Sequence, residues 1–235
     1  KFSAVHFGQC ADHGDIHSVR VFNVSIANSS RGIGIQQRTG SGSIFDLLFE
    51  HVTISTLYPT GTNWWGSGEP VWVTSVPESR AARDSLTGSV HDVTFRDVHA
   101  VGENSALLSG DGIRNIVFDR CSLTLSTIGN TSCAKGVPGA PPSGCRDYRP
   151  REPPDQAVEY GNTSVIALVG RGDITFSDST VGVAGVRQPW WLPGDHGGLC
   201  MRDGAWNVSG IVCASPALPP KWPMAGITFT GDRYW

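Results

Sequence analysis

Residues 45–54 read FDLLFEHVTI, and four other ten-residue stretches of the chain repeat this arrangement of apolar and polar residues. The third, fifth, eighth and tenth places are apolar in most copies, and a mostly polar pair separates the two halves. Alternation with a period of two indicates a strand with one buried face, so each copy predicts two short strands joined at a bend. The copies are HSVRVFNVSI (17–26), FDLLFEHVTI (45–54), HDVTFRDVHA (91–100), RNIVFDRCSL (114–123) and GDITFSDSTV (172–181).

The spacing between these copies varies, whereas the ten-residue unit stays constant. A stack of coils explains this combination, because each coil places the same positions on the coil below and lengthens only its loops. We therefore predict an all-β parallel β-helix formed by the whole chain, 1–235, as a single domain. Its interior is expected to contain one file made of Val21, Phe49, Phe95 and Phe118. The fifth copy breaks a core column with Ser179.

A further strand is expected on each coil, outside the ten-residue unit. The segments RGIGIQQ (31–37), EPVWVTS (69–75) and ENSALLSG (103–110) follow three of the copies, and SAVHFGQ (3–9) fits the same strand of a preceding coil. With Val5, Ile33, Val71 and Ala106 facing inward, neighbouring residues are predicted to form outward columns. These columns are His6, Gly34, Trp72 and Leu107, then Gly8, Gln36, Thr74 and Ser109, with Ser3, Arg31, Glu69 and Asn104 just before them.

We expect this outward wall to bind a sugar polymer. Aromatic rings stack on the C–H faces of sugars, while amides and ions pair with hydroxyl and carboxylate groups. Two alternatives remain open: an exposed Arg31–Glu69 ion pair would contribute little, and adjacent tryptophans also anchor loops. The candidate substrate-binding residues are His6, Arg31, Gln36, Trp64, Trp65, Glu69 and Trp72.

Composition and charge exclude several other functions. The net charge is -3 with 17% charged residues and no basic stripe, which argues against nucleic-acid binding. No apolar run approaches the roughly 20 residues that a membrane-spanning helix needs, so we expect no membrane partner. The histidines are scattered and no paired C-x2-C spacing occurs, so we expect no metal and no cofactor. A monomer is expected.

Cysteines and glycosylation sequons favour a secreted, glycosylated protein. A disulfide between Cys133 and Cys145 would close one loop, and one between Cys200 and Cys213 another, whereas Cys121 is expected to be a buried thiol. Residues 130–160 are expected to form a long loop insertion rich in Pro, Gly and Cys. The sequons begin at Asn23, Asn28, Asn130, Asn162 and Asn207.

Several segments resemble the polygalacturonase-like glycoside hydrolases of family 28, within the pectinase β-helix superfamily. They are SAVHFGQ, NSSRGIGIQQRTGSGSIFDLLFEHVTI, WWGSGEPVWVTSVP, GSVHDVTFRDVHAVGENSALLSG and RDYRP, and they cover about residues 3–150. The resemblance implies a right-handed parallel β-helix that is secreted and hydrolyses uronic-acid-containing polysaccharide with inversion. Inverting enzymes use two carboxyl groups about 6.5–9.5 Å apart, one protonating the leaving oxygen and one activating water.

The chain also departs from the family pattern. The N-T-D and D-D motifs that hold the family's catalytic acids are absent, so the catalytic residues are unassigned and are expected upstream, with this chain as the C-terminal part of a longer β-helix. Ser3 stands where the family has a histidine, and the family's R-I-K is here Gly34-Ile35-Gln36. The alternative is a non-catalytic glycan-binding or structural β-helix.

Overall fold

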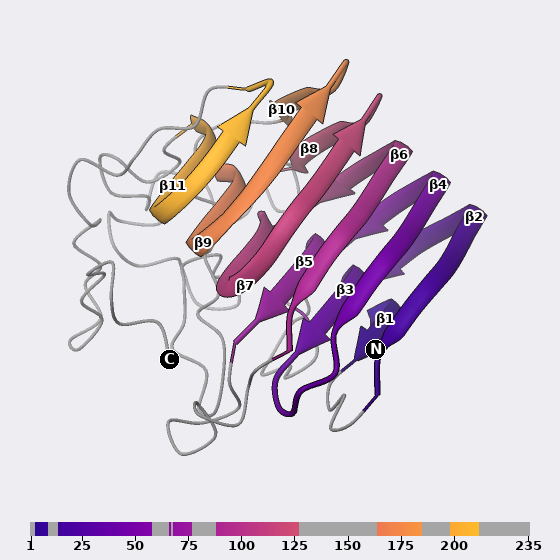
Figure 1. The fold of residues 1–235 in the computed structure, drawn as a ribbon. Coiled ribbons are helices and arrows are strands. Elements are labelled where there is room, and N and C mark those ends of the chain that lie inside the picture. The colour runs from indigo at the N-terminus through magenta and orange to yellow at the C-terminus, as the bar shows by residue number, and fades with distance from the viewer. Residues whose placement is uncertain are drawn as a thin grey trace, which may run out of the picture.

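The computed structural model describes residues 3–8, 14–57, 66, 68–76, 88–126, 164–184 and 198–211. Within these ranges the chain is all-β and contains no helix, which confirms the predicted fold class at this level. The strands form one sheet in which every pairing is parallel (Figure 1). No helix with the length and hydrophobicity needed to cross a membrane occurs in this part of the chain.

The strand pairings fall into three rows, which we number from the N-terminus. The first row begins with the short strands and continues into the first halves of three long ones. Its members are β1 (Ser3–Gly8), β3 (Arg31–Gln37), β5 (Glu69–Ser75), β7 (Ala106–Asp119), β9 (Ser164–Ser177) and β11 (Gly198–Ser209).

The second and third rows share the long strands at the N-terminal end. The second row contains the earlier parts of these strands and the later parts of β7, β9 and β11. The third row contains their later parts, followed by two short strands. The strands involved are β2 (Ile16–Ser29), β4 (Ile44–Thr56), β6 (Val90–Gly102), β8 (Ser122–Ser126) and β10 (Thr180–Ala184).

The predicted alignment of the repeat is confirmed residue by residue. Val21 pairs with Phe49, Phe49 with Phe95, and Phe95 with Phe118, and the column continues to Phe176. The phenyl ring centroids of successive phenylalanines are 5.2, 4.6 and 5.1 Å apart, and their planes are nearly parallel. These rings are almost completely buried, so the predicted interior file exists and forms the centre of the core.

The predicted bend in each copy is formed by a residue in the left-handed backbone region. The seventh residue of every copy has a φ between 47° and 56°, which is uncommon for residues other than glycine. This turn separates the second row from the third while the hydrogen-bonded pairing continues on both sides. We call this column the corner column; its residues are Asn23, His51, Asp97, Arg120 and Asp178.

Ser179 and Cys121, the serine and the cysteine in the apolar columns, both take part in hydrogen bonding nearby. The backbone N–H of Cys121 donates to the hydroxyl oxygen of Ser179 at 3.0 Å, and this hydroxyl lies 2.8 Å from the carbonyl of Ser177. The hydroxyl group of Ser179 is therefore hydrogen-bonded, although it occupies a column that is apolar in the other copies. Cys121 itself is a buried free thiol, as predicted.

Several predictions concern residues outside the described ranges. The insertion at 130–160 lies there, as do Trp64, Trp65, Cys133, Cys145 and Cys213. The loop and both disulfides therefore stay predictions. Among the sequons, Asn23, Asn28 and Asn207 lie at exposed positions of β2 and β11.

Candidate functional site

The candidate site is the outward side of the first row, where the predicted register is confirmed. His6 of β1 pairs with Gly34 of β3, Gly34 with Trp72 of β5, and Trp72 with Leu107 of β7. Residues from distant parts of the sequence are thereby placed on neighbouring strands. The strand pairing continues the column of Gln36 through Thr74 in the same way.

The expectation that this wall faces solvent is wrong for four of its candidate residues. Arg31, Gln36, Glu69 and Trp72 have exposed fractions of 4%, 6%, 1% and 4%. The alternating pattern predicted the side of the sheet correctly, but it did not predict that the side chains on that side are buried. His6 differs from them, because it is exposed.

Arg31 lies at the centre of the buried group. Its guanidinium carbon is 3.8 Å from the centroid of the Trp72 ring, a distance that permits a cation–π interaction. Its Nε lies 3.4 Å from Oε2 of Glu69, and its terminal nitrogen donates to Oε1 at 3.5 Å. The Arg31–Glu69 pair is therefore buried, so the expectation of an exposed pair is wrong. Removing one partner would leave an uncompensated charge inside the protein.

His6 connects the buried group with solvent. Partial desolvation, followed by the positive charge of Arg31, lowers the pKa of His6, and a hydrogen bond with the backbone of Gly8 opposes the shift. Both main effects disfavour the imidazolium form. His6 is consequently held as a neutral imidazole, able to donate and accept hydrogen bonds, near neutral pH.

Some polar atoms of this wall are buried without a hydrogen-bond partner. They include Nε1 of Trp72, Oγ1 of Thr74 and Nε of Arg31, although the last lies within ion-pair distance of Glu69. A buried polar atom without a partner costs free energy, and in native proteins it often marks an unseen ligand or water. These atoms are buried, so they are not accessible to a sugar on the surface.

The structure does not bring all predicted site residues together. His6, Arg31, Glu69 and Trp72 form one group, and Gln36 lies farther along the same strands beside Thr74. Trp64 and Trp65 lie outside the described residues, so their part in the site stays a prediction.

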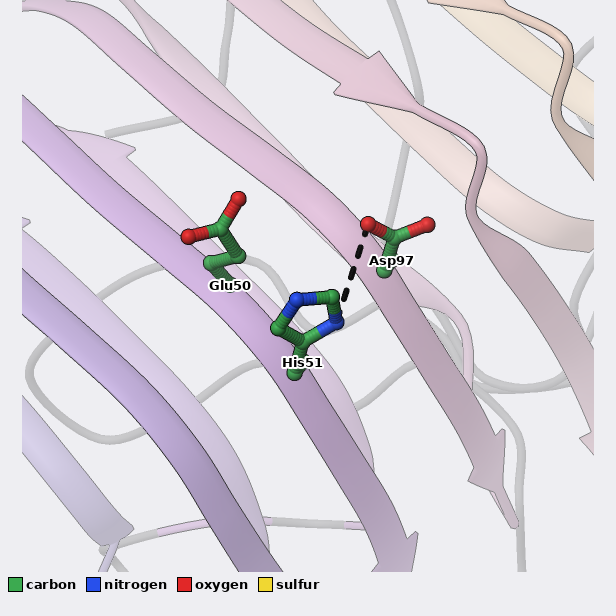
Figure 2. Close-up of side chains that lie close together, drawn as sticks. All are labelled: Glu50, His51 and Asp97. Carbon is green, nitrogen blue, oxygen red and sulfur yellow. Dashed lines mark ion pairs between the residues drawn. The ribbon is translucent and has the colours of Figure 1, made fainter.

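A second group of polar side chains, which the sequence analysis did not single out, lies at the corner column. Glu50 and His51 of β4 and Asp97 of β6 have ligand-type atoms that all lie within 4.8 Å of one another. Figure 2 shows the three side chains projecting from neighbouring strands, with the ion pair between His51 Nδ1 and Asp97 Oδ2 at 3.7 Å. The polar residues at the sixth and seventh places of the aligned copies were the feature of the sequence that indicated this group.

Arginines also contact the carboxylates of this second group. Arg120 donates to both carboxylate oxygens of Asp97, at 3.0 and 2.8 Å. Arg96 lies 3.5 Å from Oε1 of Glu50 and donates through Nε to Asp119 at 3.2 Å. The hydrogen bond from Arg120 is the main reason why the pKa of Asp97 is lowered.

Comparisons of the chain with protein-family models, with curated proteins and with solved structures each found no match.

Proposed function

We propose that this protein is a secreted, right-handed parallel β-helix of the polygalacturonase-like type. It hydrolyses glycosidic bonds in pectin-like or other uronic-acid-containing polysaccharide and inverts the anomeric carbon. The segments that resemble family 28 support this proposal, and the three rows of parallel strands are consistent with a β-helix. The catalytic acids remain unassigned.

One observation carries the proposal more than any other. The strand register aligns His6, Gly34 and Trp72 in one row, with Arg31 and Glu69 packed beside them. Gly34, which has no side chain, lies between the exposed imidazole of His6 and the buried ring of Trp72. A sugar unit at this end of the row would meet the exposed His6 imidazole, a hydrogen-bonding group of neutral charge.

The buried residues have a positioning role in this proposal. Because Glu69 already neutralises Arg31, the guanidinium orients the Trp72 ring instead of anchoring a uronate directly. Desolvation is the main cause of the lowered pKa of His6, and the charge of Arg31 adds to it. His6 is the residue of this group that contacts the sugar.

The test is to incubate the protein, together with the upstream part expected to hold the catalytic acids, with polygalacturonate and to follow the release of reducing ends, with NMR identifying the anomer formed first. We expect hydrolysis with inversion. We also expect His6→Ala to weaken binding of oligogalacturonides about tenfold, as measured by calorimetry. His99→Ala is the matched control, since His99 is an exposed histidine of β6 that points away from the first row. Equal binding by both variants would place the sugar elsewhere.

A non-catalytic glycan-binding or structural β-helix is the second candidate, and the deep burial of the Arg31–Glu69–Trp72 group favours it. Buried ion pairs are often architectural. Binding of oligogalacturonides without any release of reducing ends would establish a binding module. No binding of any uronate oligomer would leave the structural role.

A further inference from the structure

We propose that Glu50, His51 and Asp97 form a binding site for a divalent transition-metal ion of the Zn²⁺ class. An imidazole nitrogen and carboxylate oxygens are common ligands of zinc, whereas Mg²⁺ and Ca²⁺ prefer oxygen ligands alone. The expectation that scattered histidines exclude a metal is revised here, because coil stacking brings together residues that are far apart in the sequence.

The backbone places two of the ligands side by side. Glu50 pairs with Arg96 and Val52 with Val98, so His51 and Asp97 lie opposite each other on adjacent strands. Both have a left-handed backbone, with φ of 52° and 49°, which turns their side chains outward at the corner. The same turn occurs in all five copies, so it belongs to the fold, and it fixes where the two side chains lie.

The distances require only a small closure around an ion. The ligand atoms lie within 4.8 Å of one another, and His51 Nδ1 is 3.7 Å from Asp97 Oδ2. Atoms bonded to one zinc ion are about 3–4 Å apart, given bond lengths near 2.0–2.2 Å. The His51 side chain is 58% exposed, so it can rotate toward the carboxylates, and solvent can fill the remaining coordination positions.

The surrounding charges both assist and oppose the ion. Arg120 donates to both carboxylate oxygens of Asp97 and therefore competes with an ion for them. Arg120 and Arg96 also place positive charge close to the ion, while Asp119 adds a negative charge. The ion must therefore compete with the arginines, which predicts moderate affinity and a specific response to removal of Arg120.

Calorimetric titration of the intact protein with ZnCl2 tests the site. We expect one saturable event that His51→Ala abolishes, that Glu50→Gln and Asp97→Asn each weaken at least fivefold, and that Arg120→Gln strengthens. The matched control is His17→Ala, because His17 is an exposed histidine of β2 that stacks on Phe45. This variant should bind Zn²⁺ as the unchanged protein does. All five positions are at least partly exposed, so each variant should fold, and circular dichroism checks this.

Two results would overturn the proposal. Zn²⁺ binding that survives Glu50→Gln and Asp97→Asn at full strength would reduce the site to a single surface imidazole. Absence of saturable binding by the unchanged protein would exclude the site entirely. Neither result depends on polysaccharide binding, because the measured quantity is metal affinity and the ligands lie at the corner between the second and third rows.

Discussion

Cys121 lies in an interior column at the start of the third row, with its sulfur surrounded by backbone. Its Sγ donates weakly to the carbonyls of Phe95 and Asp119, at 3.3 and 3.4 Å. Burial raises the pKa of the Cys121 thiol from 9.0 to about 11. Since only the thiolate is an effective nucleophile, this cysteine is chemically inert while the protein is folded.

We expect Cys121 to resist alkylation by iodoacetamide at pH 8 and to react once denaturant unfolds the chain. Peptide mass spectrometry measures the alkylation of Cys121 separately from that of the other cysteines. Because the unfolded thiol ionises first, the contribution of Cys121 to stability is complete below pH 9 and is lost as the pH rises toward about 11. Rapid alkylation of the native protein would show that this column opens readily.

At the scale of the element, the corner column decides where each long strand turns. All five copies of the repeat place a residue other than glycine in the left-handed region at this position. Asn and Asp adopt that conformation more easily than other residues, but His51 and Arg120 do so only because the strands on both sides hold them there. The pairing of the strands on either side determines the turn as much as the conformational preference of the residue at the corner does.

Asp178, with a φ of 47°, tests this account. Replacement by glycine should leave the free energy of unfolding unchanged or raise it slightly, since glycine adopts this φ without strain. Replacement by valine should lower it by about 1–2 kcal/mol. Thr53→Val is the control, because Thr53 is exposed in an ordinary part of β4. Chemical denaturation measures the free energy of unfolding of all three variants. An Asp178→Val variant as stable as the unchanged protein would contradict the expected backbone strain.

The same elements show what could be predicted from the sequence. The period of two and the recurring four-column unit predicted the alignment of the copies, the phenylalanine file and the bends, because these follow from which side chains avoid water. Burial of Arg31, Glu69 and Trp72 could not be predicted in this way. Periodicity indicates on which side of a sheet a residue lies, but not what covers that side. The group at Glu50, His51 and Asp97 was missed because it required reading across copies at polar positions.

At the scale of the molecule, the phenylalanine file connects β4, β6, β7 and β9 through one continuous set of contacts. Phe95 stacks on Phe49 on one side and on Phe118 on the other, and it is completely buried. Phe22, in contrast, is 64% exposed. The file therefore joins coils that are far apart in sequence into one core.

We expect Phe95→Ala to lower the free energy of unfolding by about 3–5 kcal/mol, because it removes a buried ring and leaves a cavity between two others. Phe22→Ala, which removes the same atoms from an exposed position, should change it by no more than about 0.5 kcal/mol. Thermal and urea denaturation provide both values. Similar losses in the two variants would mean that the file is not the centre of the core.

Strand β7 takes part in two of the three rows at once: its first half pairs with β5 and its second half with β6 (Figure 1). Gly110, whose φ is 131°, lies where β7 passes from the first row to the second, and the pairing with β9 shifts register there. Because one continuous strand belongs to both rows, a change of conformation at this glycine would alter the pairing of both rows together.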